Sequence, residues 1–208
     1  MTNTDDLIAN LSATGAVPDR TPYLRFAGWL IAALALCGVG VAALLDGAFA
    51  SVAVDGTGPL FVKWGFSVSL LLLAPVALYV QGRPGQKTGW SLAALAGPFA
   101  LAAVLFVLSA LTTPQVFPGS TWQQCLTAMA IMSPIAFAGA ILAERQFAPT
   151  RPRRAGLAAG LFGGAVAMAA YSPYCPERGM LYLWVFYCLP ILSMATIGWM
   201  VGPRLLRW

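Results

Sequence analysis

Residues 155–201 read AGLAAGLFGGAVAMAAYSPYCPERGMLYLWVFYCLPILSMATIGWMV. Two apolar runs, Ala155–Tyr171 and Leu181–Val201, flank a short gap that contains a cysteine, prolines and the charged residues Glu177 and Arg178. Each run has about the length that a helix needs to cross the roughly 30 Å hydrocarbon layer of a membrane. The stretch is therefore typical of two membrane-spanning helices joined by a polar loop.

The same pattern recurs along the rest of the chain. Four further apolar runs are Arg25–Leu45, Leu60–Val80, Gly89–Leu111 and Trp122–Leu142. The 208 residues are 59% hydrophobic and 9% charged, whereas soluble domains carry about 25% charged residues. The sequence predicts an all-α fold, a polytopic membrane protein with six transmembrane helices.

Basic residues predict the orientation of these helices. With both termini on one side, that side holds ten Lys and Arg residues and the other side holds two. The ten are Arg20, Arg25, Arg83, Lys87, Arg145, Arg151, Arg153, Arg154, Arg204 and Arg207, and the two are Lys63 and Arg178. Because cytoplasmic segments are enriched in Lys and Arg, we expect both termini to be cytoplasmic.

This topology divides the chain into three parts. We expect a cytoplasmic N-terminal segment over 1–24, a transmembrane domain over 25–203 and a short cytoplasmic tail over 204–208. The sequence has no histidine, so it lacks the commonest general base near neutral pH. None of its seven Asp and Glu residues falls in the middle of a predicted span, which disfavours a proton-coupled transporter.

Two of the four cysteines lie near the outer face of the predicted bundle. Cys125 is one turn into the fourth run, and Cys175 lies in the last outer gap. Because disulfides persist on an oxidising side, we predict that the two approach within about 10 Å between Cα atoms. Such a pair could form a disulfide or capture a soft metal ion as thiolate ligands, and two unrelated thiols are the alternative. Cys37 and Cys188 lie inside apolar runs, where we expect buried, unlinked thiols.

Small residues mark one face of the fifth run. Gly156, Gly160 and Gly164 recur at four-residue spacing, which lets another helix approach closely. We expect this face to pack within the bundle. A homodimer formed through the same face is the alternative.

The N-terminal segment has the features of a short amphipathic helix. Asp5 and Asp6 suit the first turn of a helix, and Leu7, Ile8 and Leu11 fall on one face. A helix of about ten residues is marginal alone in water, so it is better suited to fold into the groove of a partner protein. A frayed tail is the alternative.

Five stretches carry a resemblance to a known family. They are TDDLIANL (4–11), CLTAMAIMSP (125–134), FAPTRPRRAGLAAGLFGG (147–164), YCPERG (174–179) and GPRLLRW (202–208). With these stretches in this order, the chain resembles the NrsF-type polytopic anti-sigma factors of bacterial inner membranes. The likeness runs through almost the whole chain.

The resemblance implies six spans and a cytoplasmic N-terminal segment that holds an extracytoplasmic-function (ECF) sigma factor inactive at the membrane. It also implies two outward cysteines that sense metal or oxidative stress, and these match Cys125 and Cys175. Many relatives carry histidine directly before the second cysteine, where this chain has Tyr174. This difference favours chemistry by the thiols alone.

We therefore expect a membrane anti-sigma factor of the bacterial inner membrane and not an enzyme. Its partners would be an ECF sigma factor and the lipid bilayer, without direct contact to nucleic acid. It would have no cofactor apart from a transient soft metal ion at the cysteines. In this interpretation Leu7, Ile8 and Leu11 anchor the N-terminal helix in the sigma factor, and Asp5 and Asp6 contact its basic surface. Modification of the two cysteines under stress then weakens the binding of the sigma factor.

An alternative function is that of a membrane thiol oxidoreductase or metal-handling protein that uses Cys125 and Cys175 as its working pair. The sequence lacks the C-x-x-C motif and an obvious second dithiol pair that such a protein would use.

Overall fold

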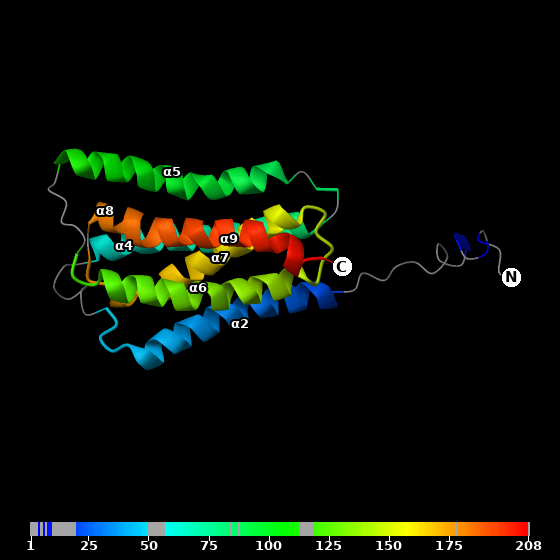
Figure 1. Ribbon diagram of the computed structural model, residues 1–208, viewed down its shortest axis with the longest axis horizontal. Helices are drawn as coiled ribbons and strands as arrows, with labels where there is room; N and C mark the ends of the chain where they lie inside the picture. Colours follow the sequence, from blue (N-terminus) through cyan, green and yellow to red (C-terminus); the bar gives the residue numbers. More distant parts are fainter. Residues whose placement is uncertain are drawn as a thin grey trace.

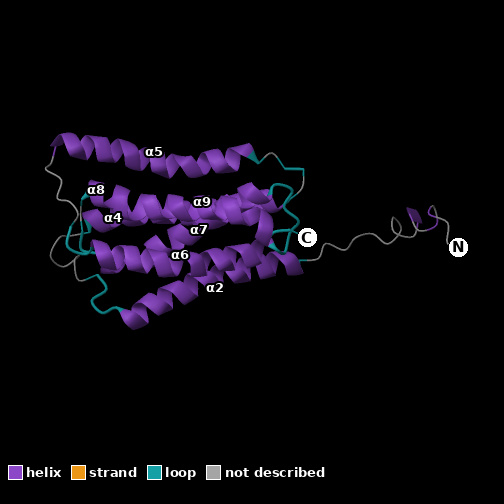
Figure 2. Ribbon diagram, viewed as in Figure 1, coloured by secondary structure: helices purple, strands orange, loops and turns teal. Residues whose placement is uncertain are grey.

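The computed structural model describes residues 4, 6, 8–9, 20–49, 57–83, 85–86, 88–112, 119–177 and 179–207. In these ranges the regular structure is helical throughout and contains no strand (Figures 1 and 2). Six helices are long and apolar enough to cross a membrane. For the described residues, this confirms the prediction of an all-α fold with six helices suited to span a membrane.

Each span lies within a few residues of its predicted apolar run. The spans are α2 (Thr21–Leu44), α4 (Gly58–Gly82), α5 (Gly89–Thr112), α6 (Trp122–Glu144), α7 (Pro152–Tyr171) and a composite last span of α8 (Met180–Leu183), the π-helix η2 (Trp184–Cys188) and α9 (Leu189–Leu205). A single 3₁₀ turn, η1 (Ser172–Tyr174), follows α7.

The α7 helix is the centre of the bundle. It packs against α4, α6 and α9, and most of its residues are buried. In contrast, α5 lies at the periphery, where only Ser91, Leu95 and Ala102 are buried (Figure 1). A peripheral helix with so much exposed apolar surface is suited to contact with lipid.

The glycines of α7 allow the closest helix contact in the bundle. A Cβ atom added at Gly156 would lie 2.1 Å from the carbonyl oxygen of Gly198, and one added at Gly160 would lie 2.4 Å from that of Met194. Gly164 is similarly close to Ile191. The face with the three glycines is therefore occupied by α9 of the same chain, which is the packing role expected above, and a second copy would have to bind elsewhere.

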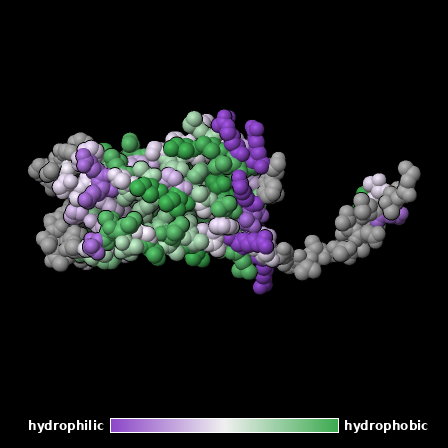
Figure 3. Space-filling model, turned by 60° about the horizontal axis from the view of Figure 1, so that its bottom comes forward, coloured by the Kyte–Doolittle hydropathy of each residue, from purple (hydrophilic) through white to green (hydrophobic). Residues whose placement is uncertain are grey.

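The molecule has two polar ends separated by an apolar band (Figure 3). The N-terminal end of α2 and the C-terminal end of α9 lie together at one of them (Figure 1). We call it the basic end, because it carries the described residues Arg20, Arg25, Arg83, Arg145, Arg151, Arg153, Arg154, Arg204 and Arg207. The opposite end, which carries Lys63, Cys125 and Cys175, is called the cysteine end.

Candidate functional site

Two of the residues predicted to bind the sigma factor lie in the described part of the chain. Asp6 and Ile8 have helical backbone and are exposed, with 59% of the Ile8 surface accessible. Asp5, Leu7 and Leu11 lie outside the described residues. The apolar side chain of Ile8 is thus accessible to a partner.

Cys125 lies in the first turn of α6 and is completely buried. Its backbone N–H donates to the Thr121 carbonyl, which is the first bond of the helix. Its thiol donates to the carbonyl oxygen of Phe186 across 3.4 Å. This contact joins the start of α6 to the last span.

A proline explains why the Phe186 carbonyl can accept this bond. In a regular α-helix that carbonyl would accept from the N–H of residue 190, but Pro190 has none. The chain widens here into the π-helix η2, in which the Leu189 N–H donates to Trp184. Such π-turns within helices frequently occur at functional sites.

Cys175 follows the η1 turn and is 2% exposed. Its N–H donates to the Ser172 carbonyl at 3.3 Å. Its own carbonyl accepts a 2.9 Å hydrogen bond from Nζ of Lys63, whose side chain is only 5% exposed. The charge pattern of the sequence predicts Lys63 only as an outer charge, although a lone lysine inside an apolar run is a signal for a functional residue.

Glu177 connects the Cys175 segment to the start of α6. Its Oε1 accepts from the N–H of Ser120 at 2.6 Å and of Thr121 at 3.3 Å, and from both hydroxyls at 2.9 and 3.5 Å. Partial burial alone would raise the pKa of Glu177, but the hydrogen bonds from Ser120 and Thr121 outweigh it and hold the pKa below its usual value. Because α6 has no cap from its own Thr121 side chain, Glu177 supplies one from across the chain.

Gly119 makes room for this carboxylate. Its φ of +84° is in the left-handed region that favours glycine, and a Cβ atom there would lie 2.8 Å from Cδ of Glu177. The loop before α6 is thus shaped to receive Glu177.

The two cysteines share a set of tyrosine neighbours. Their thiols lie within electrostatic reach of each other, and the buried Tyr187 hydroxyl lies beside both. This hydroxyl makes no regular hydrogen bond within the described ranges. The neighbouring Tyr182 hydroxyl bonds Thr121 Oγ1 at 3.3 Å. Cys125, Cys175, Tyr182, Tyr187 and Lys63 therefore form one buried group, called the thiol cluster.

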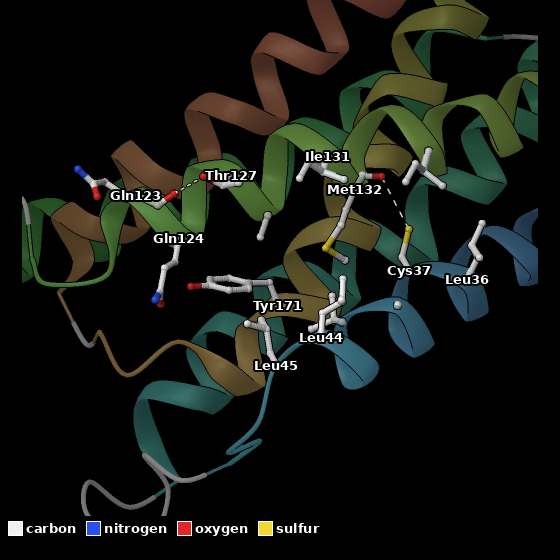
Figure 4. A pocket seen from close by; sticks show the side chains of 14 residues that line it. Leu36, Cys37, Leu44, Leu45, Gln123, Gln124, Thr127, Ile131, Met132 and Tyr171 are labelled. Atoms are coloured by element: carbon white, nitrogen blue, oxygen red, sulfur yellow. Dashed lines mark hydrogen bonds between the residues drawn. The ribbon is translucent and has the colours of Figure 1, made fainter.

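The other two cysteines lie apart from this cluster. Cys37 borders an apolar groove of about 430 Å³ between α2 and α6, and its thiol donates to the Met132 carbonyl at 3.7 Å (Figure 4). Cys188 is the last residue of η2 and is completely buried. All four cysteines are free thiols in this structure, and Cys37 and Cys188 are buried as expected.

The thiol cluster offers a metal ion two sulfur ligands. Within the described part of the chain, no group of three or more His, Cys, Asp or Glu side chains is gathered around one point. A structural zinc site uses four such ligands. The two thiols could therefore bind a soft ion only as part of its coordination shell.

Comparison with known proteins gives consistent results. The model of the NrsF family, described as "Negative regulator of sigma F", matches residues 11–208. The "Probable anti-sigma-F factor NrsF" of Azospira oryzae is 37% identical over 219 residues, and the "Anti-sigma-F factor NrsF" of Caulobacter vibrioides is 34% identical over 220 residues. Each alignment covers 99% of both chains. No solved structure matches.

Proposed function

Since this chain belongs to the NrsF family, we propose that it is an inner-membrane anti-sigma factor that holds an ECF sigma factor inactive. The observation that carries this proposal is the nearly full-length similarity to two proteins named anti-sigma-F factors. The family is regulatory rather than catalytic.

The proposed orientation places the basic end in the cytoplasm. All but one of the Arg and Lys residues that the structure describes belong to this end, and Lys63 is the exception. Lys87 and Arg178 lie outside the described residues. Since the N-terminal segment joins α2 at the basic end, this orientation would expose it to a cytoplasmic sigma factor.

In the proposed complex, a helix over the first residues occludes the sigma factor. Leu7, Ile8 and Leu11 insert into an apolar groove of the sigma factor, and Asp5 and Asp6 contact its basic nucleic-acid-binding surface. The exposed Ile8 side chain supports this arrangement.

The test is co-purification of the ECF sigma factor with the full-length protein from membranes. Leu7→Asp with Leu11→Asp should abolish co-purification, because two charges would enter an apolar groove at a cost of several kcal/mol. Ala9→Asp with Ala13→Asp adds the same charges to the opposite side of the helix and should preserve it. Equal retention of the sigma factor by both double variants would refute the helix-in-groove model.

We propose that the thiol cluster is the sensor that controls release. Hydrogen peroxide would take two electrons and two protons from Cys125 and Cys175, which leaves a disulfide and two waters. Formation of the disulfide would break the bond from the Cys125 thiol to the Phe186 carbonyl and so disturb the last span. A soft metal ion held by both thiolates would break the same bond, because each thiol must lose its proton.

Serine substitutions test this sensor. In cells that carry a reporter for the sigma factor, Cys125→Ser or Cys175→Ser should reduce induction by a thiol oxidant about tenfold or more, since neither variant can form the disulfide. Cys37→Ser is the matched control and should respond normally, because Cys37 borders the groove between α2 and α6 and lies apart from the thiol cluster. Normal induction of both outer variants would exclude the thiol cluster as the sensor and leave the anti-sigma assignment intact.

A further inference from the structure

Two arginines at the basic end converge on one hydroxyl group. Arg151 precedes the first residue of α7, and Arg154 lies in its first turn. Nη1 of Arg151 donates to Oγ1 of Thr88 at 3.1 Å, and Nη1 of Arg154 donates to the same oxygen at 3.3 Å. Thr88 directly precedes α5. Two guanidinium groups are thus held side by side where α5 and α7 begin.

This arrangement leaves two positive charges without an anion. In the described part of the chain, neither guanidinium is paired with a carboxylate. The positive ends of the α5 and α7 helix dipoles add further positive potential. Guanidinium groups recognise phosphate through parallel N–H donors, so a phosphate group is the ligand that fits their chemistry.

An apolar groove lies between the helices that start at the arginine pair. It has a volume of about 470 Å³ and lies between α5, α7 and α9. Its lining includes Leu92, Leu95, Phe99, Leu157, Leu161 and Trp199. The guanidinium of Arg153 stacks on the Trp199 ring, 4.9 Å from the ring centre.

The spacing of residues places Arg154 and Thr88 on the same helix faces as the groove. Along α7, Arg154, Leu157 and Leu161 follow one another at intervals of three and four residues, which places them on one face. Along α5, Leu92, Leu95 and Phe99 follow Thr88 in the same way. Both facing surfaces are therefore polar at the membrane boundary and apolar farther in, as a phospholipid is.

We propose that this is a binding site for an anionic phospholipid. Arg151 and Arg154 hold the phosphate of the headgroup, and an acyl chain occupies the groove. Basic pockets between membrane helices on the cytoplasmic side are a known form of such sites. A soluble phosphate would use the arginines but has no apolar part to fill the groove. The bound lipid would attach the peripheral helix α5 to the central helix α7.

The headgroup is tested with the full-length protein purified in detergent. Native mass spectrometry and thermal unfolding are followed during titration with phosphatidylglycerol, with phosphatidylcholine of the same chains, and with inorganic phosphate. Phosphatidylglycerol should bind and raise the unfolding temperature. Arg151→Gln with Arg154→Gln should weaken its affinity about tenfold or more. Arg204→Gln with Arg207→Gln removes the same charge from the same end and should leave the affinity unchanged.

The acyl chain is tested by filling the groove. Ala96 lines the groove, whereas the exposed Ala93 is not among the residues that line it. Ala96→Phe should therefore weaken phosphatidylglycerol binding, and Ala93→Phe should not. If inorganic phosphate stabilises the protein as much as phosphatidylglycerol does, the arginines bind phosphate alone and the lipid proposal is wrong. Equal binding of phosphatidylcholine, or no effect of the Arg151 and Arg154 substitutions, would overturn the proposal.

Discussion

At the scale of single residues, the cysteine end depends on two charged side chains that reach across the chain. Glu177 holds the Cys175 segment against the start of α6, and Lys63 holds the Cys175 carbonyl against α4. Each contact joins segments that are far apart in the sequence. The thiols of Cys125 and Cys175 are thus kept together by polar bonds to the backbone beside them.

Loss of the Glu177 cap should loosen the thiol cluster. Glu177→Ala removes every bond to Ser120 and Thr121 and should destabilise the protein by about 1 kcal/mol, as expected for a lost helix cap. Glu177→Gln keeps an acceptor oxygen but loses the charge, so its effect should be smaller. Thermal unfolding in detergent measures both, and equal stability of Glu177→Ala and the native protein would contradict the capping role.

The same contact has a defined pH dependence. Because the pKa of Glu177 is lower in the folded protein, its stabilising contribution is present above the unfolded pKa of about 4.3. The contribution is lost as the pH falls through the folded pKa. The stability difference between the native protein and Glu177→Gln should therefore disappear in acid.

At the scale of elements, the helices follow from the length of the apolar runs. A run that must cross the hydrocarbon layer can satisfy its backbone only as a helix, so six runs predict six spans. The bond from Cys125 to Phe186 could not be predicted in this way. Pro190 indicates that a carbonyl is left free, but only the tertiary packing decides that a thiol of α6 reaches it.

Lys63 and Glu177 show the same limit. Their sequence neighbours predict that Lys63 lies within a span and Glu177 within a loop, and both positions are observed. Their partners are 112 and 57 residues away, and one sequence contains no information on such pairs. The spacing of Gly156, Gly160 and Gly164 predicted a contact face but not its partner, which is α9.

Helix packing gives a prediction that compares two glycines. Gly160→Ala would place a methyl group 2.4 Å from the Met194 carbonyl oxygen, so α9 must shift, and we expect a loss of about 1–3 kcal/mol. At Gly28 of α2 no atom lies within 4 Å of the added methyl group, so Gly28→Ala should leave stability unchanged or slightly raised. Thermal unfolding of the two variants in one detergent makes the comparison, and equal midpoints would argue against tight α7–α9 packing.

At the scale of the whole molecule, the two ends carry the two parts of the proposed mechanism. The basic end carries the N-terminal segment and the arginine pair of the proposed lipid site, and the cysteine end carries the thiol cluster. The last span runs from Tyr182 and Tyr187 at the cysteine end to Arg204 at the basic end. It packs along α7 through the glycine face, and the proposed release mechanism would use this closely packed pair of helices to connect the thiols with the basic end.

The proposed mechanism requires one orientation in the membrane, and reporter fusions determine it. The excess of Arg and Lys at the basic end predicts a cytoplasmic signal for fusions after residues 87 and 154 and an external signal for a fusion after residue 55. The fusion at residue 154 is decisive, because Arg151 and Arg154 begin the central helix. An external signal there would place Cys125 and Cys175 on the reducing cytoplasmic side, where a disulfide would not persist. The N-terminal segment would then face away from any sigma factor, and both parts of the proposed mechanism would fail together.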